Sequence, residues 1–290
     1  MNTTGIVVGT DGSAAGAATV RWAAHEASRR RLPLHLVHAF DWNWASARFG
    51  ASSEMIELAE GHANAVVADA VVQAGQAAPD IEIHPHAVVG EPAVALLEAA
   101  RHAELLVVGN RGHGGFASLL LGSVSQHVAT HAACPVVVVR GRHEADDGPV
   151  IVGVDGSPAA QDALALAFQA AADRGCGLVA IRAHTPPTPP WGADIPPLVY
   201  DLDAVKAAAH EALETCLAPW RDKFPEVGVE ALVAIGGGAR VLVGVSHTAR
   251  LVVVGSRGHG SVAGTLLGSV GIQLLHHADC PVLIARPPAA

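Results

Sequence analysis

The sequence predicts two consecutive α/β domains, each built on an open, mainly parallel β-sheet with helices on both faces. Three observations indicate this class. The chain has 290 residues, it contains an internal repeat over nearly its whole length, and short β-branched runs alternate with Ala- and Leu-rich stretches of helical length. Half of the residues are hydrophobic, so each half can bury a core of its own.

The repeat is the duplication of a whole domain. IVVGTDGS returns as IVGVDGS, and VVGNRGHGG returns as VVGSRGHGS. Towards the end of each copy, LLLGSVSQHVATHAACPVVVVR aligns without a gap to TLLGSVGIQLLHHADCPVLIAR. The polar segment GRHEADDGP, from Gly141 to Pro149, separates the copies and is typical of a short linker. We therefore expect one domain over residues 1–143 and a second over 149–290.

Within each copy the strands are nearly continuous apolar runs, as in a parallel sheet that is covered on both faces. The first copy predicts strands near 5–10, 34–39, 81–88, 104–109 and 135–140, and helices near 14–31, 54–77, 92–101 and 123–132. The second predicts strands near 149–154, 178–183, 228–235, 250–255 and 281–286. The segments 41–53 and 184–197 are loops, either lids or partner surfaces or ordinary surface.

Charge and composition exclude several classes of partner. The formal net charge of −9 argues against a nucleic-acid partner, because binding to phosphates needs a basic surface. The start MNTTGIVVGTDGS has no signal-peptide pattern, and no run of about 18 apolar residues occurs, so we expect a cytoplasmic protein with no membrane partner. The four cysteines form no C-x-x-C pair and are expected to be reduced and buried.

The pattern G-x2-G-x9-G-[ST] follows a strand in both copies. Glycines let backbone N–H groups approach phosphate oxygens, and the last Gly-Ser pair opens a helix whose N-terminus attracts anions. A triphosphate fits this arrangement. The alternative is a glycine-rich connection in which Ser123 and Ser269 are ordinary helix N-caps.

Asp11 and Asp155 each end the first strand of their copy, at the sheet edge where open α/β proteins place their ligands. Such an aspartate can accept hydrogen bonds from ribose hydroxyls. It can equally well only cap the helix that follows. The sequence alone leaves both interpretations open.

Together, the aspartate at the strand end, the glycine pattern and the closing C-P-V strand resemble the universal stress protein family over almost all of both halves. The resemblance implies a Rossmann-like sheet in the order 3-2-1-4-5 and membership of the branch that binds ATP. It also implies that backbone near Ala39 and Ala183 meets adenine, that the aspartate meets the nucleoside and that the loop holds the phosphates. Asn110 replaces a serine frequent in the family, which Ser256 retains, so the two affinities can differ.

The resemblance and the loop physics give one set of expected ATP-binding residues per copy. Arg111, His113, Arg257 and His259 either add charge-assisted hydrogen bonds or are solvated. The first set is Gly9, Asp11, Ala39, Gly109, Asn110, Arg111, Gly112, His113, Gly114, Gly115, Gly122, Ser123 and Val124. The second is Gly153, Asp155, Ala183, Gly255, Ser256, Arg257, Gly258, His259, Gly260, Ser261, Gly268, Ser269 and Val270.

We expect no metal site made by protein groups alone, although Mg²⁺ can arrive bridging the phosphates. The sequence G-K-[ST] of a P-loop is absent, and no activated nucleophile is evident, so we expect a regulatory protein and not an enzyme. Slow ATP hydrolysis and a non-binding interaction module remain alternatives. GHGGFA and GHGSVA match a dinucleotide fingerprint only weakly, because further residues intervene before the next helix.

The closing strands Pro135–Arg140 and Pro281–Arg286 are expected to pair across a pseudo-two-fold axis, because exposed edge strands favour such pairing. Dimerisation of the whole chain is a further alternative, and the sequence identifies no regulatory protein partner.

Overall fold

The computed structural model describes residues 4–40, 53–112, 121–185, 201–258 and 267–287. Most of the two loops at 41–53 and 184–197 lies outside these residues, so their roles stay predictions.

The first half alternates strands and helices within a few residues of the expected bounds. Its elements are β1 (Ile6–Gly9), α1 (Ala14–Arg30), β2 (Leu34–Phe40), α3 (Ser53–Ala77), β3 (Ile83–Val89), α4 (Pro92–Ala99), β4 (Leu105–Gly109), α5 (Ser123–His131) and β5 (Val136–Val139).

The second half repeats this series and adds a short 3-10 turn. Its elements are β6 (Val150–Gly153), α6 (Pro158–Arg174), β7 (Leu178–His184), α7 (Leu202–Lys223), β8 (Val229–Ile235), α8 (Gly238–Val245), the turn η1 (Ser246–Thr248), β9 (Leu251–Gly255), α9 (Ser269–His277) and β10 (Val282–Ala285). No helix in the described part of the chain combines the length and the apolar character needed to cross a lipid bilayer.

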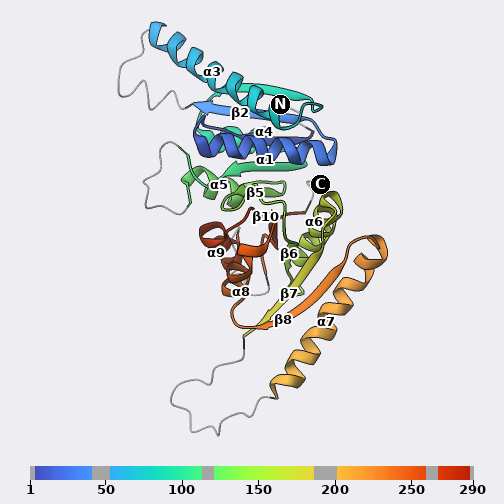
Figure 1. Cartoon of the computed structure of the whole chain (residues 1–290). Coiled ribbons are helices and arrows are strands. Elements are labelled where there is room, and N and C mark those ends of the chain that lie inside the picture. The colour runs from blue at the N-terminus through green and yellow to red at the C-terminus, as the bar shows by residue number, and fades with distance from the viewer. Residues whose placement is uncertain (1–3, 41–52, 113–120, 186–200, 259–266, 288–290) are drawn as a thin grey trace, which may run out of the picture.

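All ten of these strands form one sheet, in the order β3-β2-β1-β4-β5-β10-β9-β6-β7-β8 (Figure 1). Each half therefore shows the expected order 3-2-1-4-5, with parallel pairs throughout. The two expected sheets are joined into one by an antiparallel pair between β5 and β10.

The pairing of β5 with β10 has the signature of a pseudo-two-fold axis. Val137 lies opposite Leu283, and these two residues occupy the same position in their copies. Val136 pairs with Ile284 and Val138 with Val282, so the register is symmetric about the central pair. The predicted pairing of the closing strands is confirmed.

Helices cover both faces of the sheet, because successive strand residues point to opposite sides. Ile6 and Val8 of β1 belong to a core that includes side chains of α1, α3, α6 and α7. Val7 belongs to the core on the other face, formed with α4, α5, α8 and α9. Each core extends through both halves. The two halves therefore form one body, with a continuous sheet between two layers of helices.

The outer strands β3 and β8 differ from the expected continuous apolar pattern. Their residues alternate between exposed and half-buried positions, whereas β4, β5, β9 and β10 are buried almost throughout. The reason is their place at the two edges of the sheet, where α3 packs against β3 and α7 against β8. The expectation of fully covered strands was wrong for these two.

One arginine from each half donates hydrogen bonds to a helix of the other half. The Arg140 guanidinium, directly after β5, donates to the carbonyls of Leu274 and Leu275 at the end of α9. Arg286, directly after β10, donates to Ala129 O and Thr130 O near the end of α5, at 2.6 and 2.7 Å. Cations are favourable at helix C-termini, where carbonyls lack partners within the helix. This reciprocal pair of contacts adds polar interactions to the β5–β10 junction.

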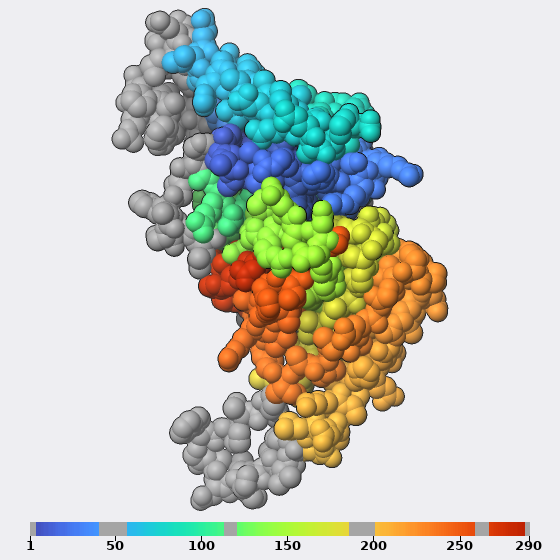
Figure 2. All heavy atoms as spheres, viewed as in Figure 1, coloured from blue at the N-terminus to red at the C-terminus, as the bar shows by residue number. Residues whose placement is uncertain are grey.

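The linker packs against the second half. Gly141 and Gly148 adopt positive φ angles of 54° and 92°, and a Cβ at either position would collide with a backbone carbonyl of the second half. Between them, Arg142 N donates to Asp279 O at 2.7 Å. Figure 2 shows the yellow-green part of the chain filling the space between the blue N-terminal elements and the orange second half.

The cysteines match the expectation only in part. All four are free, but Cys176 and Cys216 are partly exposed and the expected burial was wrong for them. Cys134 and Cys280, at equivalent positions before the closing strands, are buried. Burial raises the pKa of Cys134 to about 11 and that of Cys280 to about 12, so both remain thiols near neutral pH.

Candidate functional site

The segments 109–123 and 255–269, which we call the glycine loops, begin where β4 and β9 end. In the first loop, Gly122 N donates to Asn110 O at 2.8 Å, which brings the two ends of the loop together. Asn110 N donates in turn to Val139 O at 3.0 Å and so fixes the loop to β5.

The second glycine loop has the same backbone connections. Gly268 N donates to Ser256 O at 2.8 Å, and Ser256 N donates to Ala285 O at 3.0 Å. The replacement of serine by Asn110 in the first half leaves this scaffold unchanged, since both residues act here through backbone groups.

The helices that follow the loops have glycines and not serines as their N-caps. Gly122 and Gly268 are the N-caps of α5 and α9, with extended backbone and no side-chain hydrogen bond to the cap. Ser123 and Ser269 are the first helical residues, so the interpretation that they are N-caps is wrong. A helix start without a side-chain cap presents its first N–H groups outwards, which favours a bound anion.

Asp11 organises the turn that leads into α1. Its Oδ1 accepts from Ser13 N at 3.0 Å and from Ser13 Oγ at 2.6 Å, and Ser13 Oγ accepts from Gly16 N at 3.0 Å. Ser13 is therefore the N-cap, and the aspartate orients it. In the second half, Asp155 Oδ1 accepts from Ser157 N at 2.9 Å, and Ser157 caps α6.

The other carboxylate oxygen of each aspartate lies against a glycine loop. A Cβ at Gly112 would collide with Asp11 Oδ2, and a Cβ at Gly258 would collide with Asp155 Oδ2. Glycine is therefore required where the loop passes the carboxylate. The structure brings the aspartate and the loop together as the sequence predicted, and the ribose contact itself stays a prediction.

In the second half these groups surround a pocket of about 650 Å³. Nine of the predicted residues line it. They are Gly153, Asp155, Ala183, Gly255, Arg257, Gly258, Gly268, Ser269 and Val270. Residues from β6, β7, β9 and α9 thus converge at the carboxyl ends of the strands, where ligands of open α/β sheets bind.

The pocket also has an apolar wall that the sequence analysis did not identify. Ile181, Leu242, Val254 and Leu267 line it, together with Gly238 at the start of α8. Ile181 lies two residues before Ala183, so strand alternation could have indicated that both point to one face. The contribution of α8 depends on how that helix crosses the sheet and has no motif in the sequence.

Of the predicted second-half residues that the structure describes, Ser256 lies away from the pocket. Ser256 is 4% exposed and does not line the pocket. His113, Gly114, Gly115, His259, Gly260 and Ser261 lie outside the described residues, so their contacts stay predictions.

The first half has the same framework around β1 and β2. Gly9 and Gly153 end their strands with a leucine side chain close by, since a Cβ would lie 2.8 Å from Leu96 Cδ1 or 2.7 Å from Leu242 Cδ1. Ala39 lies near the end of β2, as Ala183 does in β7. Gly109, Arg111, Ser123 and Val124 occupy the same elements as their counterparts that line the second-half pocket.

Among the described residues, no group of three or more His, Cys, Asp or Glu side chains is arranged to hold a metal ion. The pocket of the second half has one carboxylate, Asp155, and one cation, Arg257, among its lining residues. An oxygen-seeking cation such as Mg²⁺ would therefore take most of its ligands from a bound phosphate and from water.

Comparison with known proteins agrees with this geometry. The model of the universal stress protein family matches residues 3–140 and 148–286. A universal stress protein of Mycobacterium tuberculosis is 38% identical over 295 residues, which cover 97% of this chain and 96% of that protein. The chain belongs to the universal stress protein family.

Solved structures also match. A universal stress protein from Archaeoglobus fulgidus superimposes with a TM-score of 0.70 over 99% of each chain, at 19% identity, and supports the fold. A universal stress protein solved in complex with cAMP is 33% identical and matches 48% of this chain and 96% of its own length, with a TM-score of 0.35.

Proposed function

We propose that each half binds one ATP molecule and that the protein acts as a nucleotide-dependent regulator. The observation that carries the proposal is the second-half pocket, in which nine residues chosen from the sequence line one space of about 650 Å³. A pocket of this volume is within the usual range for small-molecule ligands.

The phosphate end of the site would be the glycine loop and the start of α9. Gly268 caps this helix without a side-chain hydrogen bond, so the first-turn N–H groups can donate to phosphate oxygens. Arg257 is exposed at the same rim and can add a charge-assisted hydrogen bond. In the first half, Gly122 and Arg111 occupy the equivalent positions.

The nucleoside end would be the strand edge. Asp155 lies between the glycine loop and the end of β6, where a ribose hydroxyl can donate to its carboxylate. Ala183 and the apolar side chains of Ile181 and Leu242 offer a surface for a purine ring. Because Asp155 Oδ1 already accepts from Ser157 N, we assign the carboxylate to orientation of the sugar and not to activation of water.

Mg²⁺ is part of the proposal as a cation bridging the phosphates. The protein would hold the oxygen-rich ligand, and the cation would neutralise its charge. A homodimer of whole chains would have to use surfaces other than β5 and β10, which already pair within the chain.

The first experiment is to purify the protein, denature it and identify released small molecules by mass spectrometry. Adenine nucleotide at up to two molecules per chain is the expected result. A flavin or nicotinamide cofactor would contradict the proposal, and a preparation that neither carries nor binds ATP on titration would favour the non-binding module.

A second measurement separates regulation from turnover. ATP in excess over the protein, incubated with Mg²⁺, should remain intact over many times the dissociation half-life. Multiple turnovers that disappear when Asp11 and Asp155 are replaced by Asn would instead support the alternative of a hydrolase.

A further inference from the structure

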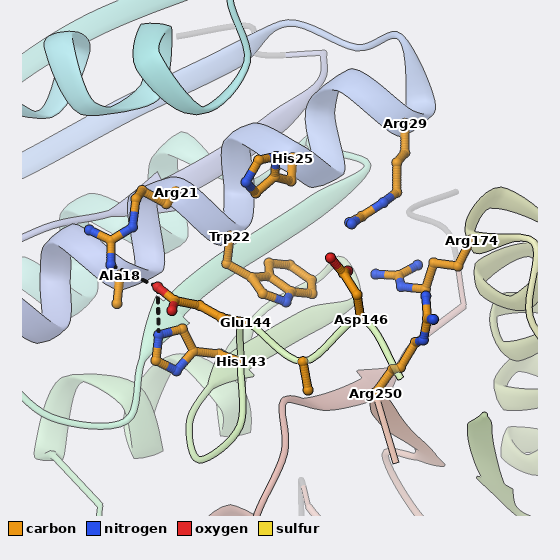
Figure 3. Close-up of a pocket in the computed structure, with 11 residues that line it drawn as sticks. Ala18, Arg21, Trp22, His25, Arg29, His143, Glu144, Asp146, Arg174 and Arg250 are labelled. Atoms are coloured by element: carbon orange, nitrogen blue, oxygen red, sulfur yellow. Dashed lines mark hydrogen bonds and ion pairs between the residues drawn. The ribbon is translucent and has the colours of Figure 1, made fainter. Parts of the chain in front are cut away.

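A second pocket, of about 420 Å³, lies at the junction of the two halves and away from both glycine loops (Figure 3). Helix α1 forms one wall, and linker residues 143–146 form another. The second half contributes Arg174, at the end of α6, and Arg250, directly before β9. We call this space the junction pocket.

The charge of the junction pocket is opposite to that of the whole molecule. Four arginines line it, namely Arg21, Arg29, Arg174 and Arg250, against two linker carboxylates. The chain as a whole has 18 basic and 27 acidic residues. Such a concentration of guanidinium groups in an acidic protein creates a local positive potential that attracts anions.

A buried carboxylate beneath the pocket neutralises only part of this charge. Glu26 is 1% exposed and pairs with three arginines. Arg174 lies 2.6 Å from its carboxylate, Arg30 2.7 Å and Arg29 3.5 Å. Glu26 carries one negative charge and its three arginine partners carry three positive charges, so this cluster has a net positive charge. Two of these arginines, Arg29 and Arg174, line the pocket.

The two ends of the pocket differ in how far their charges are compensated. At one end, Arg21 pairs with Glu144 at 3.0 Å. Arg29, Arg174 and Arg250 lie at the other end, beyond the Trp22 indole (Figure 3). Arg250 Nε is buried and has no hydrogen-bond partner among the described residues. Buried donors of this kind are normally satisfied, but this donor lacks an acceptor in the described part of the chain, although the Asp146 carboxylate lies at the same end of the pocket.

We propose that the junction pocket binds a small anion with at least two negative charges on phosphate groups, held by Arg29, Arg174 and Arg250. Guanidinium groups match phosphate oxygens with paired hydrogen bonds and hold them better than a single point charge does. The volume suits a diphosphate or a small phosphorylated metabolite. Since the arginines come from both halves, the bound anion bridges them.

Asp146 allows a test in which a substitution should strengthen anion binding and not weaken it. This exposed linker residue projects into the same end of the pocket as the three arginines (Figure 3). Its carboxylate would repel an incoming anion and would occupy the place beside the arginines that the anion would take. Removing its charge should therefore strengthen anion binding, whereas removing an arginine should weaken it.

The test is calorimetric titration with inorganic pyrophosphate, with thermal unfolding of each variant as the control for folding. The double variant Arg29→Gln/Arg250→Gln should lose about tenfold or more in affinity, and Asp146→Asn should gain severalfold. Arg101→Gln removes one positive charge from a surface pair with Glu98, away from the pocket lining, and should bind as the wild type does.

Three outcomes would overturn the proposal. Wild-type protein could fail to bind pyrophosphate, or the folded arginine variant could bind it unchanged, or citrate could bind more tightly than pyrophosphate. Pyrophosphate can also occupy the glycine loops. If binding is lost in Gly122→Val/Gly268→Val and retained in the arginine variant, it belongs to the loops and the junction site is wrong.

Discussion

The two proposed nucleotide sites share one backbone framework but differ in the helix that follows the third strand. In the second half, α8 starts at Gly238, where a Cβ would lie 3.6 Å from Val270 Cγ2 and 3.8 Å from Ala183 Cβ. The equivalent residue of the first half, by the repeat offset, is Pro92, the first residue of α4. We therefore expect the proline ring to narrow the first proposed site where the second is open.

The caps of these helices differ as well. Glu91 caps α4 and accepts from Ala93 N and Val94 N, which places a carboxylate at the entrance of that helix. Gly237 caps α8 without a side chain. Helix α4 therefore has a carboxylate at its N-cap, whereas α8 has none at the equivalent position. If both proposed sites bind ATP, this difference predicts unequal affinities.

The junction of the halves shows a similar break in symmetry. Arg30 and Arg174 occupy the same position in α1 and α6, yet both bind the carboxylate of Glu26. The second-half equivalent of Glu26 is Ala170, which is buried. One glutamate therefore pairs with arginines from both copies, and this contact is asymmetric. By contrast, Arg140 and Arg286 make equivalent contacts in both directions.

Glu26→Gln should have the largest effect on stability. The variant leaves Arg174, which is 5% exposed, without its anionic partner. Loss of one partner of a buried ion pair costs about 3–5 kcal/mol, measured as the free energy of unfolding in a denaturant titration. Ala170→Ser, a small polar change at the equivalent site, is the control for disruption of helix packing and should cost less.

Glu26 should also make the free energy of unfolding depend on pH in the acidic range. Burial raises the pKa of Glu26, but attraction to Arg174, Arg30 and Arg29 outweighs it and brings the pKa below the ordinary value of 4.5. The stabilisation is therefore complete above about pH 4.5 and is lost as the pH falls through the lower pKa of the folded state. Below about pH 4.5, wild type should lose up to about 1.4 kcal/mol per pH unit more than Glu26→Gln. Parallel curves would show that Glu26 does not titrate as described.

Arg140→Ala and Arg286→Ala should come next, with nearly equal costs. Each arginine donates to two carbonyls at the end of a helix in the other half, and hydrogen bonds involving a charged group contribute about 1.5–3 kcal/mol. Unfolding by denaturant measures both variants, and Arg101→Ala is the exposed control. Costs that differ several-fold would show that the symmetric contacts are not energetically equivalent.

Exchanging Pro92 and Gly238 should change nucleotide affinity at one site each. Gly238→Pro should weaken ATP binding in the second half about tenfold, since small shape changes in a pocket have effects of this size. Pro92→Gly should strengthen it in the first half. Gly237 has φ −69° and ψ 134°, which suit a residue before proline, so Gly238→Pro should fold. Unchanged affinities in both variants would remove this explanation of site asymmetry.

Ser125→Ala should have the smallest effect and only in the first half. Ser125 Oγ donates to Gly109 O at 2.5 Å and ties α5 to the start of the glycine loop. The equivalent residue of the second half is Gly271, which has no side chain to do this. The expected loss is about 1 kcal/mol in the free energy of unfolding, with a modest loss of ATP affinity at the first site. A loss of affinity at both sites would contradict a local role.

Most of the fold was predictable because the sequence signals are local or repeated. Apolar runs of β-branched residues located the strands, and the repeat located the same elements twice. The pairing of β5 with β10 followed from the position of the closing strands. Strands β3 and β8 were predicted, but their partial exposure was missed, because it depends on which helices cover them and not on their own composition alone.

The candidate site was predictable to the extent that a motif carries it. Gly258 and Asp155 were found separately, and the collision that a Cβ at Gly258 would have with Asp155 explains why both are needed. Leu242 and Gly238 were missed because α8 reaches the site only through tertiary packing. The junction pocket was missed for the same reason, since Arg29 and Arg250 are 221 positions apart in the chain.

The most direct test of one ATP site per half is a calorimetric titration of the wild type, Gly122→Val, Gly268→Val and the double variant. A Cβ at either glycine would lie 3.5 Å or more from the nearest non-neighbouring atom of the described residues, and both φ angles are negative, so the fold should tolerate the change. The valine side chains would nevertheless stand where phosphate meets the helix start. We expect up to two sites in the wild type, one fewer in each single variant and none in the double variant, with thermal unfolding little changed. A folded double variant that binds ATP as tightly as the wild type would contradict the account.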